Sequence, residues 1–134
     1  MTLGPGDEAL IGIAALARQR AHAPYSKYKV GAAVRTKRNK SHAGANVENV
    51  SYGLTVCAER TAVFAAVNAG DTSFDAIAIV IDDERLPSPC GACRQVLAEF
   101  SPDMRVILAT TGGLRKATTL SELLPDPFLP ENLR

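Results

Sequence analysis

Three cysteines and one glutamate are the residues of this sequence most suited to chemistry. Cys57 is followed two positions later by Glu59, and Cys90 and Cys93 are three apart; the chain has no other cysteine. Three thiolates can hold one Zn²⁺ and leave its fourth tetrahedral position open for water, the arrangement of a catalytic rather than a structural site. A carboxylate beside such a water can carry protons to and from it. The spacing therefore predicts a catalytic zinc with Glu59 as its proton carrier.

A Cys-x-x-Cys pair alone is ambiguous, because it also occurs in redox sites and in halves of zinc fingers. The third cysteine favours catalytic zinc, since a structural site would want a fourth Cys or His. The two histidines, His22 and His42, lie outside both motifs. We expect a helix-end surface position for His22 and a strand position for His42, with neither binding the metal.

Two arginines follow the motifs directly. Three thiolates and Zn²⁺ carry one net negative charge, so the metal would polarise its water less than it does with neutral ligands. A guanidinium that donates to a thiolate would withdraw part of that charge. We assign this role to Arg60, beside Glu59. For Arg94, beside Cys93, a thiolate contact and a surface ion pair both remain open.

Composition sets the broad class. The chain has 134 residues, of which 46% are hydrophobic and 22% charged, with a formal net charge of +1. These values are typical of a globular protein of one domain, here residues 1–134. We find no apolar run of membrane-spanning length, no leader-like start and no basic stripe for a nucleic acid. Three cysteines cannot all pair internally, so we expect a cytoplasmic protein with reduced, metal-bound thiols.

Hydrophobic periodicity predicts alternating helices and strands. Helices are expected over 7–22, 57–69, 91–100 and, in a short form, 118–124, capped by Thr119 or Ser121. Strands are expected over 29–36, 41–46, 76–81 and 105–109, and 125–130 is read as an extended tail. The first two strands form a hairpin, and the apolar run 76–81 is typical of a central strand. This order predicts an α/β fold with helices covering a mixed sheet.

Both cysteine motifs fall where the chain begins a helix. Backbone N–H groups and the helix dipole favour anions at a helix N-terminus. They lower the pKa of a thiol toward the thiolate, which is the form that binds metal. Cys90 and Cys93, three apart on a first turn, can reach one ion together.

Two polar segments allow a functional and a structural interpretation. Asn46 and Glu48, in a loop just before the first motif, suit the vicinal hydroxyls of a sugar and equally suit turn capping. The basic cluster Arg35, Lys37, Arg38 and Lys40 suits a phosphate, but a solvated hairpin tip is the interpretation we favour.

The helix over 57–69 is apolar on nearly every side. A helix of this kind is buried all round. One sheet of a chain this short cannot cover it completely, so we expect burial against other subunits.

These motifs strongly resemble the small homotetrameric cytidine deaminases of pyrimidine salvage, in the cytidine and deoxycytidylate deaminase superfamily. The resemblance follows the family's order and spacing over nearly the whole domain. The matching stretches are APYSKYKVGAA (23–33), GANVENVSYGLT (44–55), CAERTA (57–62), SPCGACRQVLAEF (88–100) and ELLP (122–125).

The resemblance implies a three-layer cytidine-deaminase-like fold, with a mixed sheet of about five strands between helices. It implies one zinc per subunit on Cys57, Cys90 and Cys93, with zinc-bound water attacking C4 of cytidine or deoxycytidine and Glu59 shuttling protons. Uridine or deoxyuridine and ammonia are the expected products.

The resemblance also implies the substrate contacts. The ribose hydroxyls fall to Asn46 and Glu48, and the base falls to Ala58 and to the ring of Tyr28, where the family usually has Phe. Phe128 is expected to enter the site of a neighbouring subunit in a homotetramer. That arrangement also implies burial of the apolar helix at the centre of the tetramer.

Three other functions remain as alternatives. A deaminase of a blasticidin-type antibiotic shares both cysteine motifs, although the Asn-Val-Glu-Asn loop favours a plain nucleoside. A non-catalytic zinc module is disfavoured by Glu59 and by the missing fourth ligand. A polynucleotide editor would need positive charge and a channel for flanking nucleotides, which the sequence does not offer.

Overall fold

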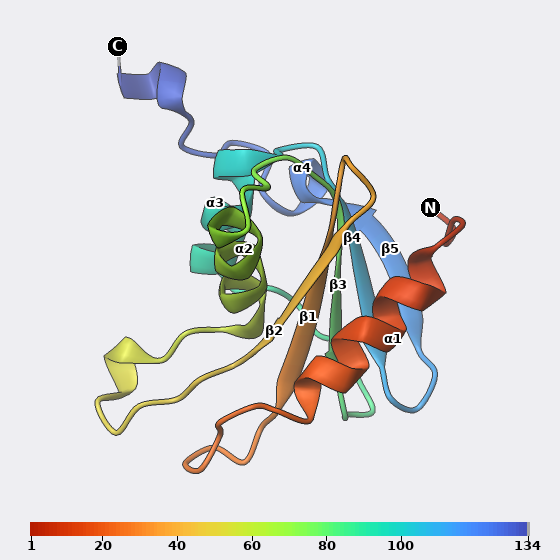
Figure 1. Ribbon diagram of the computed structural model, residues 1–134, viewed down its shortest axis with the longest axis vertical. Coiled ribbons are helices and arrows are strands. Elements are labelled where there is room, and N and C mark those ends of the chain that lie inside the picture. Colours follow the sequence, from red (N-terminus) through yellow and green to blue (C-terminus); the bar gives the residue numbers. More distant parts are fainter. Residues whose placement is uncertain (134) are drawn as a thin grey trace.

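A five-stranded mixed sheet organises the chain, and the computed structural model describes its residues 1–133 (Figure 1). The strands lie in the order β2-β1-β3-β4-β5, so β3 is central. The pair β3–β4 is parallel and the other neighbours are antiparallel. The strands are β1 (Val30–Thr36), β2 (Ser41–Ala45), β3 (Phe74–Ile81), β4 (Arg105–Thr110) and β5 (Arg115–Thr119).

Helices cover both faces of this sheet and make three layers. Helix α1 (Asp7–Arg18) lies on one face, while α2 (Ala58–Asn68) and α3 (Gly91–Phe100) lie on the other (Figure 1). Each interface holds its own apolar cluster, one around Leu10 and Ile107 and one around Val63 and Leu97. The expected three-layer α/β fold is confirmed. Within residues 1–133, no helix is both long enough and apolar enough to cross a bilayer.

Two glycines let the helices approach the hairpin closely. A Cβ at Gly31 would lie 2.0 Å from the carbonyl oxygen of Ala14 in α1. A Cβ at Gly44 would lie 2.5 Å from the backbone nitrogen of Ala62 in α2. Both distances are far below van der Waals contact. The hairpin β1–β2 is therefore clamped between α1 and α2 at positions where only glycine fits.

The structure corrects the ends of three predicted elements. The first helix ends at Arg18, because His22 leaves it to pair with Val47 in a β-bridge. Residues 118 and 119, expected in a short helix, belong to β5, a strand missing from the expected ranges. Helix α4 (Leu120–Leu123) follows, and the hydroxyl of Thr119 caps it as expected. The tail expected to be extended ends in a 3₁₀ turn, Pro130–Leu133.

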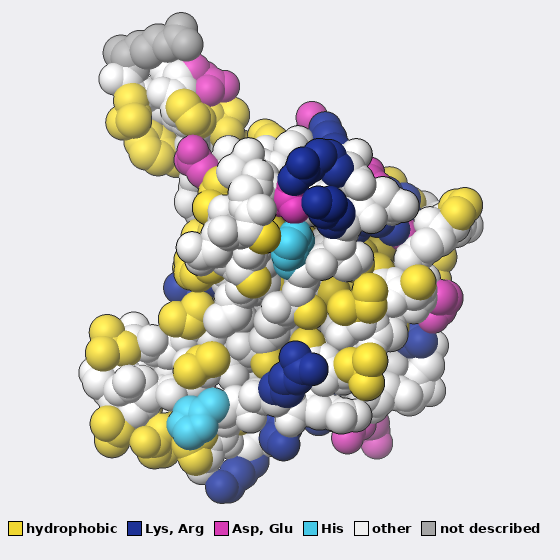
Figure 2. Space-filling view, in the orientation of Figure 1, with side chains coloured by type: hydrophobic (Ala, Val, Ile, Leu, Met, Phe, Trp, Pro, Cys, Tyr) yellow, Lys and Arg dark blue, Asp and Glu magenta, His cyan; other side chains and the backbone are white. Residues whose placement is uncertain are grey.

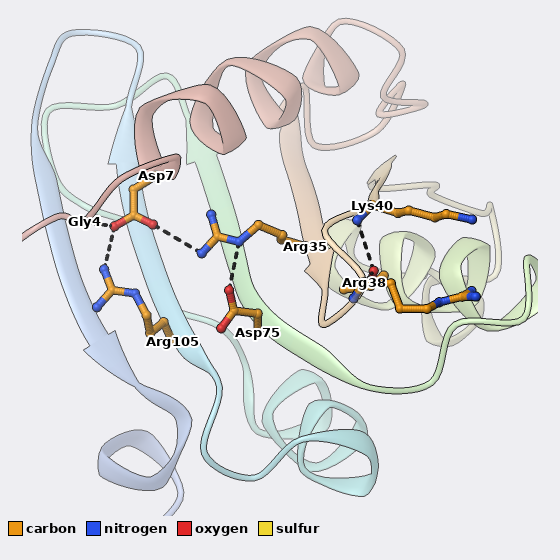
Figure 3. Close-up of polar contacts among 8 residues, drawn as sticks. Gly4, Asp7, Arg35, Arg38, Lys40, Asp75 and Arg105 are labelled. Atoms are coloured by element: carbon orange, nitrogen blue, oxygen red, sulfur yellow. Dashed lines mark hydrogen bonds and ion pairs between the residues drawn. The ribbon is translucent and has the colours of Figure 1, made fainter.

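A buried carboxylate fixes the start of α1 to the sheet (Figure 3). The side chain of Asp7 is 1% exposed and lies 2.5 Å from Arg105 on β4 and 3.7 Å from Arg35 on β1. It also accepts the backbone N–H of Gly4 at 2.5 Å, while Arg35 reaches Asp75 at 3.0 Å. Asp7 is thus the ion-pair partner of Arg105 and shares Arg35 with Asp75.

The basic hairpin tip is partly neutralised as well. Arg38 and His42 both bind the buried carboxylate of Asp71, just beyond the end of α2. Figure 2 shows basic, acidic and histidine side chains gathered over this part of the molecule. With Arg35 and Arg38 paired to aspartates, the cluster is not a free phosphate patch. The hairpin-tip interpretation is therefore the better one.

We expect Asp7→Asn to lower the free energy of unfolding by about 3 kcal/mol, because it removes the charge of a buried carboxylate and leaves the partly buried guanidinium of Arg105 without its ion-pair partner. Urea denaturation followed by circular dichroism measures the change. Glu8→Gln is the matched control: Glu8 is exposed and pairs with Arg115 at the surface, so its loss should cost less than about 1 kcal/mol. Equal losses in the two variants would contradict the assigned role of Asp7.

Candidate metal centre and substrate cavity

Three sulfurs converge at the point where α2 and α3 begin. The Sγ atoms of Cys57, Cys90 and Cys93 all lie within 4.8 Å of one another, and Cys90 and Cys93 are 3.4 Å apart. Zinc–sulfur bonds of about 2.3 Å in a tetrahedron place sulfurs about 3.8 Å apart. The cluster therefore fits one zinc ion. Within residues 1–133 it includes neither histidine, so the fourth coordination position is left for a water or substrate atom.

The local structure explains how these cysteines serve as anionic ligands. Cys57 and Cys90 are the residues that precede the first turns of α2 and α3, and the backbone N–H of Cys93 donates to the Cys90 sulfur at 3.4 Å. Arg60 donates to the Cys57 sulfur at 3.5 Å, as expected from the sequence. Both helix N-termini thus present N–H groups and positive dipole ends to the metal site.

Cys57 and Cys93 hold their thiol protons unequally. The pKa of Cys57 falls to about 5, because the Cys93 thiol donates a hydrogen bond to its sulfur and the Arg60 guanidinium adds a second. The pKa of Cys93 rises, because it is that donor and is buried. Zinc binding must therefore release the proton of Cys93, as metals do when they bind thiols.

Glu59 is a buried carboxylate beside this cluster. It is the second residue of α2 and is 5% exposed. Burial raises the pKa of Glu59, and the negative charge of Cys57 raises it further. A raised pKa makes this carboxyl a stronger proton acceptor than an ordinary glutamate, which suits a group that must both accept and return a proton.

A cavity of about 320 Å³ opens onto Glu59 and two of the sulfurs. It holds most of the residues that the sequence proposed for substrate: Tyr28, Asn46, Glu48 and Ala58. The complete lining is Ser26, Tyr28, Val30, Asn46, Glu48, Thr55, Cys57, Ala58, Glu59, Ile79, Ile81, Pro87, Ser88 and Cys90. The lining thus combines apolar side chains with polar groups and two of the sulfurs.

Asn46 and Glu48 also hold part of the cavity wall in place through hydrogen bonds to the backbone. The side chain of Asn46 accepts from the backbone of Val30 at 2.9 Å and donates to the carbonyl of Tyr28 at 2.8 Å. The carboxylate of Glu48 accepts the backbone N–H groups of Tyr25 and Ser26 and the Ser26 hydroxyl. These contacts reach residues 16–23 positions earlier in the chain, so they differ from the local turn capping considered from the sequence. The loop has a structural role, but a long-range one. It does not exclude sugar binding, since both side chains still line the cavity.

Phe128 and Arg94, which the sequence also singled out, do not line the cavity. Phe128 is 59% exposed, on a tail that leaves the body of the molecule (Figure 1). Arg94 makes neither of the contacts left open for it. Its guanidinium donates to the carbonyls of Pro89 and Leu123 and to the Ser88 hydroxyl. These bonds stabilise the loop that leads into Cys90.

Sequence reasoning missed much of the cavity lining. Ser26, Thr55 and Ser88 lie within the stretches that resemble the deaminases, but no local pattern singles them out, and their places depend on how three separate loops pack. Ile79 and Ile81 were recognised only as core residues of the central strand. A usable signal existed for the isoleucines, because the carboxyl end of a parallel strand is where α/β folds place ligands.

Comparison with known proteins identifies the family. Residues 5–110 match the model of the cytidine and deoxycytidylate deaminase zinc-binding region. The chain belongs to this family.

Individual relatives agree with the assignment to the deaminase family. A cytidine deaminase of Halalkalibacterium halodurans is 49% identical over 127 residues, which cover 94% of this chain and 96% of the relative. The crystal structure of a cytidine deaminase from Burkholderia pseudomallei superposes with a TM-score of 0.88 at 48% identity and covers 96% of this chain and 100% of that one. A blasticidin-S deaminase of Bacillus cereus is 39% identical over 108 residues, covering 75% of this chain and 76% of that protein.

The three-cysteine cluster requires all of its sulfurs for tight metal binding. We expect Cys90→Ala to reduce zinc from one per chain to a small fraction of that, because two thiolates hold zinc far less tightly than three. Metal analysis of the dialysed protein by mass spectrometry measures the content. Glu99→Gln, at an exposed position of the same helix, should keep its zinc. Stoichiometric zinc in Cys90→Ala would contradict the ligand set.

The contacts of Glu48 predict a pH dependence of stability. The Ser26 hydroxyl holds the pKa of Glu48 below its ordinary value of 4.5. The ionised carboxylate therefore stabilises the folded chain fully above pH 4.5, and this contribution is lost as the pH falls through the lowered value. Glu48→Gln should lower the melting temperature by a constant amount from about pH 6 to pH 8. The difference from wild type should shrink only in acid; a difference that shrinks near neutrality would contradict this assignment.

Proposed function

We propose that this chain hydrolyses cytidine and deoxycytidine to uridine and deoxyuridine with release of ammonia. The observation that carries the proposal is the cluster of three sulfurs, open at its fourth position, beside the buried carboxylate of Glu59 in one cavity. Membership of the deaminase family and the activity named for relatives nearly half identical in sequence support the same substrate class.

Glu59 is the proton carrier in this proposal. A zinc ion held by Cys57, Cys90 and Cys93 supplies a Lewis acid that makes a water acidic near neutral pH. Glu59 takes one proton from the attacking water and delivers it to N3 of the pyrimidine. It then takes the second proton from the hydroxyl formed at C4 and gives it to the amine, so that the C4–N bond breaks, ammonia leaves and the C4 carbonyl forms. Burial of Glu59 favours both roles, because a raised pKa lets the same carboxyl act first as base and then as acid.

The remaining cavity residues bind the nucleoside. Asn46 and Glu48 bind the ribose hydroxyls with the hydrogen-bonding capacity that their loop contacts leave free. The ring of Tyr28 stacks on the base, and Ala58, which is fully buried at the start of α2, bounds the base pocket. Arg60 withdraws charge from the Cys57 thiolate and so keeps the zinc electrophilic.

The active form in this proposal is a homotetramer of single-domain chains, residues 1–134, in the cytoplasm. Helix α2 leaves Phe64 exposed, and Val50, Tyr52 and Leu54 of the preceding loop are exposed as well. Hydrophobic side chains gather on two projections of the molecule, the C-terminal segment and the loop around Tyr52–Leu54 (Figure 2). Apolar surface of this kind on one side of a chain is typical of subunit contacts, and Phe128 of one chain would complete the cavity of another.

A blasticidin-type substrate is the second candidate, because a relative that is 39% identical bears that name. Ammonia release from cytidine and from blasticidin S, measured on the same preparation, separates the two. A non-catalytic zinc module is disfavoured by the buried Glu59, which such a module would not need. A polynucleotide editor is disfavoured by the net charge of +1.

The function is tested by following the loss of cytidine absorbance over time in the presence of zinc-loaded protein. Wild-type protein should release stoichiometric ammonia and lose activity with a chelator. Glu59→Gln should retain zinc, because it removes no ligand, and lose about 10²- to 10⁴-fold in kcat, because it removes the proton carrier. Parental turnover in this variant would refute the role of Glu59, and wild-type protein inert toward cytidine would refute the function.

A further inference from the structure

Gln95, the residue after Arg94, binds the backbone of the C-terminal tail through its side-chain amide. The Gln95 amide nitrogen donates to the carbonyl of Phe128 at 2.6 Å, and the Phe128 N–H donates to the Gln95 amide oxygen at 3.1 Å. A primary amide has one donor side and one acceptor side, so it pairs with both backbone groups of one residue as a neighbouring strand would. This two-point contact fixes the orientation of Phe128 as well as its position.

The contact is the tail's main attachment. Among the described residues, these two are the only hydrogen bonds that join 125–133 to the rest of the chain. Pro125 and Pro127 lie just before Phe128, and each restricts its backbone and lacks an N–H. The segment is therefore stiff, and one clamp near its middle determines where it points.

The clamp leaves the side chain of Phe128 free. Its ring is 59% exposed and does not line this chain's own cavity. A contact that served only to dock the tail would bury the ring, since burying a Phe contributes about 1.5–3 kcal/mol. Holding the backbone while exposing the ring suits a residue that is presented to something outside the chain.

We propose that Gln95 is a positioning residue that presents the ring of Phe128 to the substrate cavity of a neighbouring copy of this chain. The inference rests on the proposed function and its shared sites. Gln95 stands two residues after the zinc ligand Cys93 on the same rigid helix. Each chain thereby fixes its Phe128 ring relative to its own metal centre, and this ring forms part of the cavity of the neighbouring chain. When the ring is already fixed before the substrate arrives, less conformational entropy is lost on binding than with a mobile ring.

Steady-state kinetics with cytidine on zinc-loaded variants tests this role. Gln95→Ala should raise KM about tenfold, the effect of two lost hydrogen bonds, with kcat, zinc content and oligomeric mass close to wild type. Gln95→Glu should not rescue KM, because a carboxylate cannot donate to the Phe128 carbonyl. Glu99→Ala, exposed on the same helix and without side-chain hydrogen bonds, is the control and should match wild type.

A double-mutant cycle separates positioning from a general structural effect. If Gln95 acts through the ring of Phe128, adding Gln95→Ala to Phe128→Ala should leave KM where the single variant Phe128→Ala puts it. Additive effects, or a Gln95→Ala variant with unchanged KM, would overturn the proposal. A fall in zinc content together with kcat would also overturn it, because Gln95 would then be acting on the metal loop.

Hybrid oligomers and hydrogen exchange complete the test. Phe128→Ala chains mixed with Glu59→Gln chains should regain sites of normal KM, and Glu59→Gln chains that also carry Gln95→Ala should not restore them. The Phe128 amide should exchange slowly in wild type and faster in Gln95→Ala; equal rates would refute the clamp. Wild-type protein inert toward cytidine would refute the proposed function and this role together, whereas active wild type with unaffected Gln95 variants refutes the role of Gln95 alone.

Discussion

The structure depends on two helices that begin at the same place. Helices α2 and α3 lie on one face of the sheet and start side by side, so that the residues before their first turns bring three sulfurs within 4.8 Å. The parallel β3–β4 crossover returns α3 to the face that α2 already covers. Gly44 lets α2 lie close against the hairpin, and the Thr61 hydroxyl donates to the carbonyl of Ala45 at 2.7 Å. A small shift of either helix would separate ligands that belong to different segments of the chain.

Placing these sulfurs at helix N-termini also determines the electrostatics of the site. Three thiolates repel one another, and dipole ends, the Cys93 N–H and the Arg60 guanidinium offset that repulsion. Glu59 shares the same first turn of α2 but lies deeper. It is therefore subject to burial and to the negative sulfurs, which raise its pKa. One helix start thus favours the anionic form at Cys57 and the neutral form two residues later.

The sequence is informative where the governing interactions are local. Spacings of two to four residues predict the cysteine motifs, their positions before helices and the contact of Arg60 with Cys57. The structure has all of these features. Strand β5 was missed because Arg115 and Lys116 give it no apolar pattern; pairing with β4 forms it. The first helix was drawn too long because its end depends on the bridge from His22 to Val47. The contacts of Arg94 and Gln95 reach carbonyls about 30 residues away, which no local pattern encodes.

The cavity wall shows why residues proposed to bind substrate are hard to assign a purely structural or a purely functional role. The same groups of Asn46 and Glu48 that face the cavity also hold backbone segments 25–30 in place. Hydrogen-bonding groups that are fixed by their own scaffold lose little freedom when a ligand binds, so a structural contact improves a binding one. Tyr28 belongs to the segment that Asn46 fixes, and its ring lines the same cavity. Loss of Asn46 would therefore displace an aromatic wall in addition to removing a polar contact, and the two effects cannot be assigned to separate residues.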